Sequence, residues 1–202
     1  QGMTAHYLLF DTWPVKAGDT ILVHAAAGGV GSIMVQWARA LGAEVIGTVG
    51  SAAKAERARA LGCAHVINYS EEDFATRVRE LTGGAGVPVV YDSIGRKTFD
   101  ASLSCLRPRG TMVTYGNATG PVEPFECARL AALGSLYVTR PKLADYIATR
   151  AELVQRATSL FEVVANHSVR IDIGQRFKLA EAADAHRALE SRATIGSTVL
   201  LP

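Results

Sequence analysis

The fold is decided by the stretch Ile21–Gly50, ILVHAAAGGVGSIMVQWARALGAEVIGTVG. It begins with an apolar run, Ile21–Ala26, which is typical of a buried parallel strand because such strands are apolar without alternation. After a turn of small residues, apolar side chains recur at helical spacing: Ile33, Met34, Trp37, Ala38 and Leu41, with Gly42 as the stop. A second apolar strand, Val45–Val49, completes a βαβ unit typical of dinucleotide binding.

The turn of this unit, Ala27-Gly28-Gly29-Val30-Gly31, is the candidate pyrophosphate loop. A pyrophosphate needs backbone N–H donors without side-chain bulk at the positive end of a helix. Gly28 permits close approach, and Gly31 lets the helix pack tightly on the strand. The pattern G-x-G-x-x-G has Ala26 in its first position, and alanine can make this turn if its φ stays negative. A glycine-rich turn that binds nothing is the alternative.

Composition indicates a globular protein without a polyanionic partner. The chain has 202 residues, of which 49% are hydrophobic and 20% charged, with a net charge of +2. This balance gives no argument for nucleic acid or a membrane, and the opening contains no signal-like segment, so we expect a soluble cytoplasmic protein. The three cysteines are far apart and form no C-x-x-C, which predicts free thiols and no metal site. Because the chain begins at Gln1 inside a helical pattern, we expect it to be the second part of a longer protein.

Beyond Gly50, strand and helix patterns continue to alternate. Four further segments have strand character: His65–Tyr69, Val87–Tyr91, Gly110–Tyr115 and Ser135–Thr139. Helical patterns lie between them: Ala52–Leu61, Glu72–Leu81, Lys97–Leu106 and a short helix through Leu133. Strands interleaved with helices predict an α/β protein with a doubly wound parallel sheet, the Rossmann fold. Ligands of such sheets bind beyond the carboxyl ends of the strands, where the sequence has Gly28, Gly50, Tyr69, Ser93 and Asn117.

The last part of the chain has a different character. A long helix, about Leu143 to Asn166, leads away from the sheet. Val169–Leu179 alternates like an antiparallel strand, and a helix to Glu190 and a strand Ser197–Leu201 follow. We therefore expect a dinucleotide-binding domain over residues 1–166 and, over residues 167–202, part of an incomplete second domain.

The end of the second strand favours NADPH over NADH. An NAD site carries an Asp or Glu there, whereas Gly47–Ser51 contains no acid and Lys54 follows within a turn. A carboxylate would repel a 2′-phosphate, and an ammonium attracts one. Arg57 and Arg59 lie farther along the same helix. A solvated surface lysine, and hence an enzyme that prefers NAD, is the alternative.

Five motifs together resemble the NADPH:quinone oxidoreductases, in the zinc-independent branch of the medium-chain dehydrogenase/reductase superfamily. They are HAAAGGVG (24–31), VINY (66–69), VVYDSIG (89–95), YGNATG (115–120) and ESRATIGSTVLLP (190–202). The resemblance covers the whole chain and implies that a GroES-like catalytic domain is missing from it. Its relatives pair through the strand that corresponds to Ser135–Thr139, so the resemblance also implies a homodimer.

The resemblance implies roles for individual residues. The loop from Ala27 to Gly31 would hold the pyrophosphate. The adenosine 2′-phosphate would be surrounded by Gly50, Ser51, Lys54, Tyr69 and Arg192. The ribose and nicotinamide end would be lined by Ser93, Asn117, Tyr137, Val138 and Thr4. Structural alternatives exist for several residues: Tyr69 as a strand-end aromatic, Ser93 as a turn former and Arg192 as a solvated arginine.

Other conspicuous residues are expected to be structural. His24 lies within the first strand, where a core histidine hydrogen-bonded to a neighbour is expected. Asp92 is expected to cap a turn, and the stripe of Met34, Trp37 and Leu41 to be helix core.

The predicted function is hydride transfer from NADPH to a quinone or other α,β-unsaturated carbonyl compound, without a metal. The sequence contains no acid/base pair that we assign as catalytic. For this chain by itself we expect weakened NADPH binding, little turnover and an apolar patch formed by the tail and the helix Thr4–Phe10. Two alternatives remain: a non-catalytic NADPH-binding module or sensor, and the cofactor domain of a zinc-dependent alcohol dehydrogenase relative.

Overall fold

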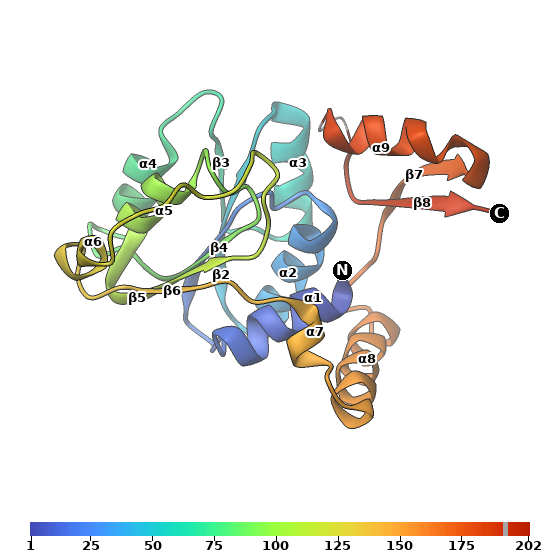
Figure 1. Cartoon of the computed structure of the whole chain (residues 1–202), viewed down its shortest axis with the longest axis horizontal. Coiled ribbons are helices and arrows are strands. Elements are labelled where there is room, and N and C mark those ends of the chain that lie inside the picture. The colour runs from blue at the N-terminus through green and yellow to red at the C-terminus, as the bar shows by residue number, and fades with distance from the viewer. Residues whose placement is uncertain (192–193) are drawn as a thin grey trace.

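The chain forms a six-stranded parallel sheet, as the computed structural model of residues 1–191 and 194–202 shows (Figure 1). The strands are β1 (Thr20–Val23), β2 (Glu44–Val49), β3 (His65–Asn68), β4 (Val87–Asp92), β5 (Leu106–Thr114) and β6 (Tyr137–Thr139). Their order is β3-β2-β1-β4-β5-β6, and every pairing is parallel. From β1 the strands are added on one side as β2 and β3, and then on the other side of β1 as β4, β5 and β6. This arrangement confirms the predicted doubly wound α/β fold.

Helices cover both faces of the sheet. One face carries α1 (Gly2–Tyr7), α2 (Gly29–Ala40) and α3 (Ala52–Leu61), and the other α4 (Phe74–Leu81) and α5 (Phe99–Cys105). Successive strand residues point to opposite faces, so Ile21 and Val23 join the first core while Leu22 joins the second. Since both faces are covered, the central strands are apolar throughout, as the sequence indicates.

Capping residues determine where α4 begins and where α3 ends. The Asp73 side chain accepts from the Thr76 amide at 2.7 Å, so α4 starts at Phe74, two residues later than the helical pattern suggests. Gly62 ends α3 with φ of 104°, a conformation that favours glycine.

The single helix predicted from about Leu143 to Asn166 is wrong. The structure has a short α7 (Leu143–Tyr146) and a separate α8 (Arg150–Ala165). Thr149 and Glu152 form a capping box: the Glu152 amide donates to the Thr149 hydroxyl at 3.2 Å, and the Thr149 amide donates to the Glu152 carboxylate at 2.9 Å. This box starts a new helix and therefore divides the segment.

The first twelve residues pack into the core. After α1 the chain continues as a π-helical turn, Leu8–Thr12, in which Leu8 and Leu9 are fully buried. Tyr91 donates from its hydroxyl to the backbone oxygens of Leu8 at 3.0 Å and Trp13 at 3.2 Å. The prediction that Thr4–Phe10 contributes to an open apolar patch is therefore wrong for most of this segment, because it packs against α2, α7 and α8.

The tail forms a separate small unit of β7 (Ile173–Lys178), α9 (Ala182–Glu190) and β8 (Ser197–Leu201), with a 3₁₀ turn at Leu179–Glu181. β7 and β8 pair in parallel, so the predicted antiparallel strand is wrong. A parallel pair needs a crossover, and α9 supplies it. This unit lies beside α3, away from the β6 edge (Figure 1). Several of its large apolar residues are exposed, including Leu179, Leu189, Leu200 and Leu201.

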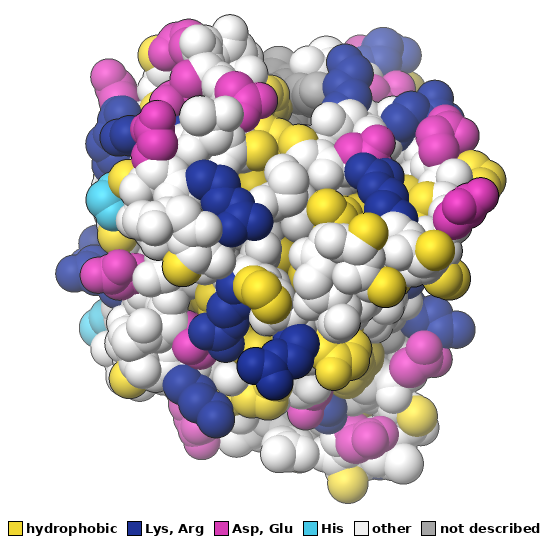
Figure 2. Space-filling view, turned by 90° about the vertical axis from the view of Figure 1, so that its left-hand side faces the viewer, with side chains coloured by type: hydrophobic (Ala, Val, Ile, Leu, Met, Phe, Trp, Pro, Cys, Tyr) yellow, Lys and Arg dark blue, Asp and Glu magenta, His cyan; other side chains and the backbone are white. Residues whose placement is uncertain are grey.

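The side of the molecule opposite the tail has charged side chains interspersed among its apolar atoms (Figure 2). It carries α4, α5 and α6 (Ala128–Ala132). Figure 2 shows Lys and Arg side chains gathered near its centre, with apolar atoms scattered between them. Charged side chains thus interrupt the apolar surface there. Within the described parts of the chain, no helix has both the length and the apolar character needed to cross a membrane.

Candidate dinucleotide site

The loop between β1 and α2 brings backbone N–H groups to the carboxyl edge of the sheet. Gly28 is the N-cap of α2, with φ of −81°, and its own amide donates to the Ala25 oxygen at 2.8 Å. The amides of Val30 and Gly31 have no hydrogen-bond acceptor among the described residues. These donors lie in the first turn of a helix, where the helix dipole favours negative charge. The geometry is that of an anion site.

Close packing explains the glycine at position 31. A Cβ there would lie 2.2 Å from the Ala25 oxygen, so no side chain fits unless α2 moves. The positive φ of the turn, 51°, falls on Ala25. Ala26 does not share it, so an alanine in the first position of the fingerprint causes no backbone strain.

The tail lies against this loop. The Gly196 amide donates to the Ala27 oxygen at 3.2 Å, and the Ser197 hydroxyl donates to the Gln1 side chain at 2.8 Å. The Gln1 side chain in turn lies where a Cβ of Gly29 would be. The two ends of the chain therefore meet at the candidate pyrophosphate loop.

A cavity of about 170 Å³ opens beside the loop. Six of the predicted site residues line it: Ala27, Gly28, Gly50, Lys54, Tyr69 and Ser93. Leu189 and Thr194 from the tail complete its wall. Residues from six separate parts of the sequence thus meet at one place. Apart from the tail residues, they follow the carboxyl ends of neighbouring parallel strands, where such a site is expected.

Gly50, Ser51 and Tyr69 are fixed by local contacts. A Cβ at Gly50 would lie 2.5 Å from the Tyr69 hydroxyl oxygen, so Tyr69 covers Gly50 and its ring would have to move to admit a side chain there. The Ser51 hydroxyl accepts from the Lys54 amide at 3.4 Å and caps α3. Arg57 forms an ion pair with Asp172, a structural role. Arg192 lies outside the described residues.

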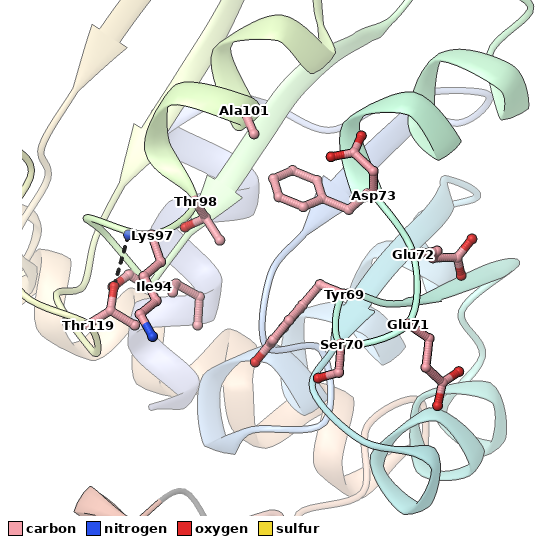
Figure 3. A pocket seen from close by; sticks show the side chains of 11 residues that line it. Tyr69, Ser70, Glu71, Glu72, Asp73, Ile94, Lys97, Thr98, Ala101 and Thr119 are labelled. Carbon is pink, nitrogen blue, oxygen red and sulfur yellow. Dashed lines mark hydrogen bonds between the residues drawn. The ribbon is translucent and has the colours of Figure 1, made fainter.

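A larger cavity of about 560 Å³ adjoins the first and shares Tyr69 and Ile94 with it (Figure 3). Figure 3 shows the Tyr69 ring pointing inward from the β3 side, opposite Ile94 and Lys97. The Lys97 amide donates to the Thr119 hydroxyl at 3.1 Å, which joins the loops after β4 and β5. An aromatic ring facing an aliphatic side chain makes a slot for a flat ring. Sequence reasoning missed Ile94, Lys97 and Thr119, although all three follow strands whose carboxyl ends lie at this edge.

The remaining predicted residues lie toward β6. Asn117 and Val138 line a third cavity, of about 340 Å³. The Ser93 oxygen accepts from the Ala118 amide at 3.2 Å, and the Ser93 side chain is hydrogen-bonded to Tyr115. Burial raises the pKa of Tyr115, and the hydrogen bond to Ser93 opposes that rise.

Tyr137 and Thr4 lie apart from these cavities. Tyr137 is 62% exposed on the edge strand, on the face opposite to that of Val138. Thr4 is half-buried in α1. Neither residue lines any of the three cavities.

Buried hydrogen bonds to Asp92 hold the loop that follows β4 at the carboxyl edge of the sheet. Asp92 is fully buried and accepts from the amides of Ile94 at 2.6 Å and Gly95 at 3.1 Å, and from the Thr98 hydroxyl at 2.7 Å. The expected turn-capping role of Asp92 is therefore confirmed. It shapes the loop that carries Ser93.

His24 is a core histidine, as predicted. Its ring nitrogens are hydrogen-bonded to the hydroxyls of Thr48 at 2.7 Å and Ser102 at 2.8 Å. Burial lowers the pKa of His24, and the charge of Asp92 opposes this only in part. The imidazole is consequently neutral at pH 7.

The sheet order, the donor-bearing loop and the cavities along the carboxyl edge define the class of Rossmann-type dinucleotide-binding domains. More particularly, the chain belongs to the zinc-binding dehydrogenase family, whose model matches residues 29–159. The resemblance to quinone oxidoreductases stated from the sequence motifs is also confirmed by the relatives.

Two curated relatives and one solved structure illustrate that similarity. Over its whole length the chain is 54% identical to a 2-haloacrylate reductase of Burkholderia sp, of which it covers 61%. It is 52% identical to a quinone oxidoreductase of Salmonella typhimurium, of which it covers 62%. The structure of Escherichia coli quinone oxidoreductase complexed with NADPH matches all of the chain with a TM-score of 0.98 and 50% identity, and the chain covers 62% of it. The chain thus spans about three fifths of the length of these relatives.

The family description names zinc, but the described residues do not fit a zinc ion. Within residues 1–191 and 194–202, no three His, Cys, Asp or Glu side chains form a group that could hold a metal. Cys63 and Cys105 are buried, and burial raises the pKa of each thiol to about 12, which disfavours the thiolate that binds zinc.

Proposed function

We propose that this chain is the cofactor-binding part of an oxidoreductase that transfers a hydride from NADPH to a quinone or another α,β-unsaturated carbonyl compound. The observation that carries the proposal is the pair of unpartnered amides of Val30 and Gly31 beside the cavity lined by Lys54. Support also comes from the Escherichia coli quinone oxidoreductase, which was solved with NADPH and matches the entire chain.

In this proposal the loop from Ala27 to Gly31 binds the pyrophosphate through its backbone amides. The 2′-phosphate lies at the end of β2, beside Gly50, Lys54 and Tyr69, which line the cavity, and next to Ser51. A contact from Arg192 stays a prediction of the resemblance, since that residue lies outside the described part of the chain. No carboxylate follows β2 to repel it, since Ser51 is followed by Ala52 and Ala53. The flat slot between Tyr69 and Ile94 suits the adenine ring. A buried phosphate contact would make NADPH bind more tightly than NADH.

The nicotinamide end lies toward β5 and β6, with Ser93, Asn117 and Val138 as its contacts. Thr4 and Tyr137 stay predictions that depend on parts of the protein beyond this chain. NADPH, once bound, supplies the hydride. The chain holds the cofactor in one orientation and removes water from one side of it.

The names of the relatives suggest the class of acceptor. A quinone and a 2-haloacrylate share a carbon–carbon double bond conjugated to a carbonyl or carboxylate carbon. Hydride addition to the β-carbon of that bond pushes electrons onto an oxygen. An electron-poor alkene of this kind is therefore the proposed acceptor class.

We also propose a division into a cofactor domain, residues 1–166, and a return segment of a second domain, residues 167–202. The exposed apolar residues of the tail support it, because monomeric proteins seldom leave such groups uncovered. β6 pairs only with β5 within the described chain, and we propose that its open edge pairs with a second copy in a homodimer. Free Cys63, Cys105 and Cys127 fit the cytoplasm, where thiols stay reduced.

Titration tests the proposal directly. The intact protein that carries these residues is titrated with NADPH and NADH by calorimetry, and turnover of a quinone panel is then measured. Tight NADPH binding with quinone turnover supports the proposal. NADPH binding without turnover of any acceptor favours a non-catalytic module or sensor, and no binding of either cofactor contradicts both.

A further inference from the structure

Arg140 follows β6 and ties two strand ends together. Its Nη1 atom donates to the Thr114 backbone oxygen at 3.2 Å, the Thr114 hydroxyl at 3.2 Å and the Gly116 oxygen at 2.9 Å. All three acceptors lie at the carboxyl end of β5, directly before Asn117. One nitrogen of the guanidinium thus holds the side chain at the proposed nicotinamide end.

The other nitrogens of this guanidinium remain available. Across the described residues, Nε and Nη2 of Arg140 have no hydrogen-bond partner and the side chain has no ion-pair partner. Two other arginines, by contrast, form ion pairs: Arg96 with Glu123, and Arg129 with Asp100. A guanidinium is always charged and carries five N–H donors. Arg140 therefore presents a positive charge and spare donors to whatever lies beside it.

Arg140 faces a largely apolar cavity. With Asn117 and Val138 it lines the space of about 340 Å³ whose remaining wall includes Phe99, Val122 and Phe125. Arg140 is itself exposed at the edge of this cavity, so its guanidinium is accessible to a ligand that enters from solvent. The cavity therefore suits a small ligand with an apolar body and one negatively charged oxygen.

Arg140 also lies close to α1. Burial, followed by the neighbouring Tyr146, raises the pKa of Tyr7 to about 12, and the charge of Arg140 opposes this rise. Tyr7 stacks on Tyr146 with ring centroids 4.3 Å apart and stays protonated at neutral pH. The charge of Arg140 thus acts on Tyr7 of α1 as well as at the end of β5.

We propose that Arg140 binds the negatively charged oxygen of the hydride acceptor and thereby determines which acceptors are used. That oxygen is either the carboxylate of an α,β-unsaturated acid or the carbonyl oxygen of a quinone, which becomes anionic during reduction. The proposal rests on the proposed function. It assigns to this chain a substrate contact in addition to cofactor binding.

The chemistry is balanced without a further reactant. The acceptor gains a hydride from NADPH at the β-carbon of its conjugated double bond. The π electrons of that bond move through the conjugated system onto the carbonyl or carboxylate oxygen, and the cofactor becomes NADP⁺. Arg140 stabilises the charge on that oxygen without giving up a proton, because a guanidinium stays protonated in proteins. A proton from water then completes the product.

The test compares Arg140→Met and Arg140→Lys in the intact protein, with Arg129→Met as the matched control because Arg129 pairs with Asp100 and does not itself line the cavity. The acceptors are 2-chloroacrylate, its neutral methyl ester and 1,4-benzoquinone. Loss of a charge-assisted hydrogen bond should lower kcat/KM for 2-chloroacrylate about 100-fold in Arg140→Met, mainly through KM. The methyl ester and the quinone should lose about tenfold, mainly through kcat. Arg140→Lys should recover part of each loss.

A purely structural clamp predicts a different result. If Arg140 only positions the loop before Asn117, Arg140→Met should weaken NADPH binding and affect all three acceptors equally. Unchanged NADPH affinity with selective loss of the anionic acceptor supports the proposal. An equal loss for all acceptors, or no loss, overturns it.

Binding without turnover separates this proposal from the proposed function. Acrylate is titrated by calorimetry into the protein saturated with NADP⁺. Binding by the wild type and by Arg129→Met, but not by Arg140→Met, supports the anion contact even if no acceptor is reduced, in which case only the proposed function fails. If the Arg140→Met variant reduces quinones as fast as the wild type and all variants bind acrylate equally, the proposed role of Arg140 is overturned. The proposed function is then still supported.

Discussion

The two halves of the carboxyl edge of the sheet are built differently. Around β1 and β2, the site consists of backbone amides and closely packed glycines: a Cβ at Gly31 would lie 2.2 Å from the Ala25 backbone oxygen, and one at Gly50 would lie 2.5 Å from the Tyr69 hydroxyl oxygen. Around β5 and β6, the cavity is lined mainly by side chains, such as Asn117 and Arg140, although Gly116 is also closely packed, since a Cβ there would lie 2.5 Å from the Ser93 backbone oxygen. The first half is suited to a constant group such as a diphosphate. The second can vary with the acceptor.

The strongest test of this contrast is Gly31→Ala. The new Cβ would meet the Ala25 oxygen, so α2 must shift, and we expect the free energy of unfolding to fall by about 3 kcal/mol with no measurable NADPH binding. Denaturant unfolding and calorimetry check this. Gly28→Ala is the control, since its Cβ would be 3.1 Å from that oxygen and its φ is −81°. It should fold nearly normally yet bind NADPH less tightly; equal stability of the Gly31→Ala protein and the wild type would refute the packing argument.

Asp92→Ala tests how much the buried Asp92 hydrogen bonds stabilise the loop after β4. Removing the carboxylate leaves the amides of Ile94 and Gly95 and the Thr98 hydroxyl without their buried acceptor, so unfolding should become easier by about 2–3 kcal/mol. Thermal and denaturant unfolding measure the effect. Thr98→Val removes only one of these donors and should cost less. A larger loss in Thr98→Val than in Asp92→Ala would show that the carboxylate is not the centre of this network.

Lys54→Ala sharpens the contrast on the phosphate side. If the ammonium contacts a 2′-phosphate, NADPH affinity should fall about tenfold, or about 1.4 kcal/mol, while NADH affinity stays constant. Arg59→Ala, on the same helix, serves as the control because it does not line the cavity. Parallel changes for both cofactors would assign Lys54 a role unrelated to the 2′-phosphate.

The last expected effect is a pH dependence of stability that originates at His24, beneath the carboxyl edge of the sheet. The pKa of buried His24 is lowered, so the unfolded chain binds a proton more readily than the folded one. The stabilisation is present above the unfolded pKa of about 6.5 and is lost as the pH falls below it, by up to about 1.4 kcal/mol per pH unit.

Denaturant unfolding between pH 5 and 8 would show this slope, and His24→Gln should reduce it. His6, whose pKa burial also lowers, contributes in the same direction, so part of the slope should remain in His24→Gln. A slope that is identical in both proteins would exclude His24 as its source.

The accuracy of sequence reasoning followed the same division. Ile21–Gly50 was sufficient to predict strand, loop, helix and strand, because hydrophobic periodicity and glycine requirements are local. The errors occurred where a distant or polar contact decided the outcome. The Thr149–Glu152 capping box divided a segment that looks like one helix, and α9 placed β7 and β8 in parallel although β7 alternates like an antiparallel strand.

The site was predictable to a similar extent. Six residues inferred from the sequence and its resemblance line one cavity around Gly28 and Lys54, since each follows a strand at the same edge. Ile94 and Lys97 were missed because nothing in their own neighbourhood signals a slot facing Tyr69. Arg140 was missed for the same reason, since its spare donors become apparent only when its contacts with Thr114 and Gly116 are known.

By itself, the sequence determined the α/β architecture, the glycine loop and the absence of an acid after the second strand, because each depends on the chemical nature of neighbouring residues. The tertiary structure alone decided which amides lack a partner, that Arg57 pairs with Asp172, and that the tail lies against the loop. These features depend on atoms brought together from distant parts of the chain, and their positions follow from packing rather than from local pattern.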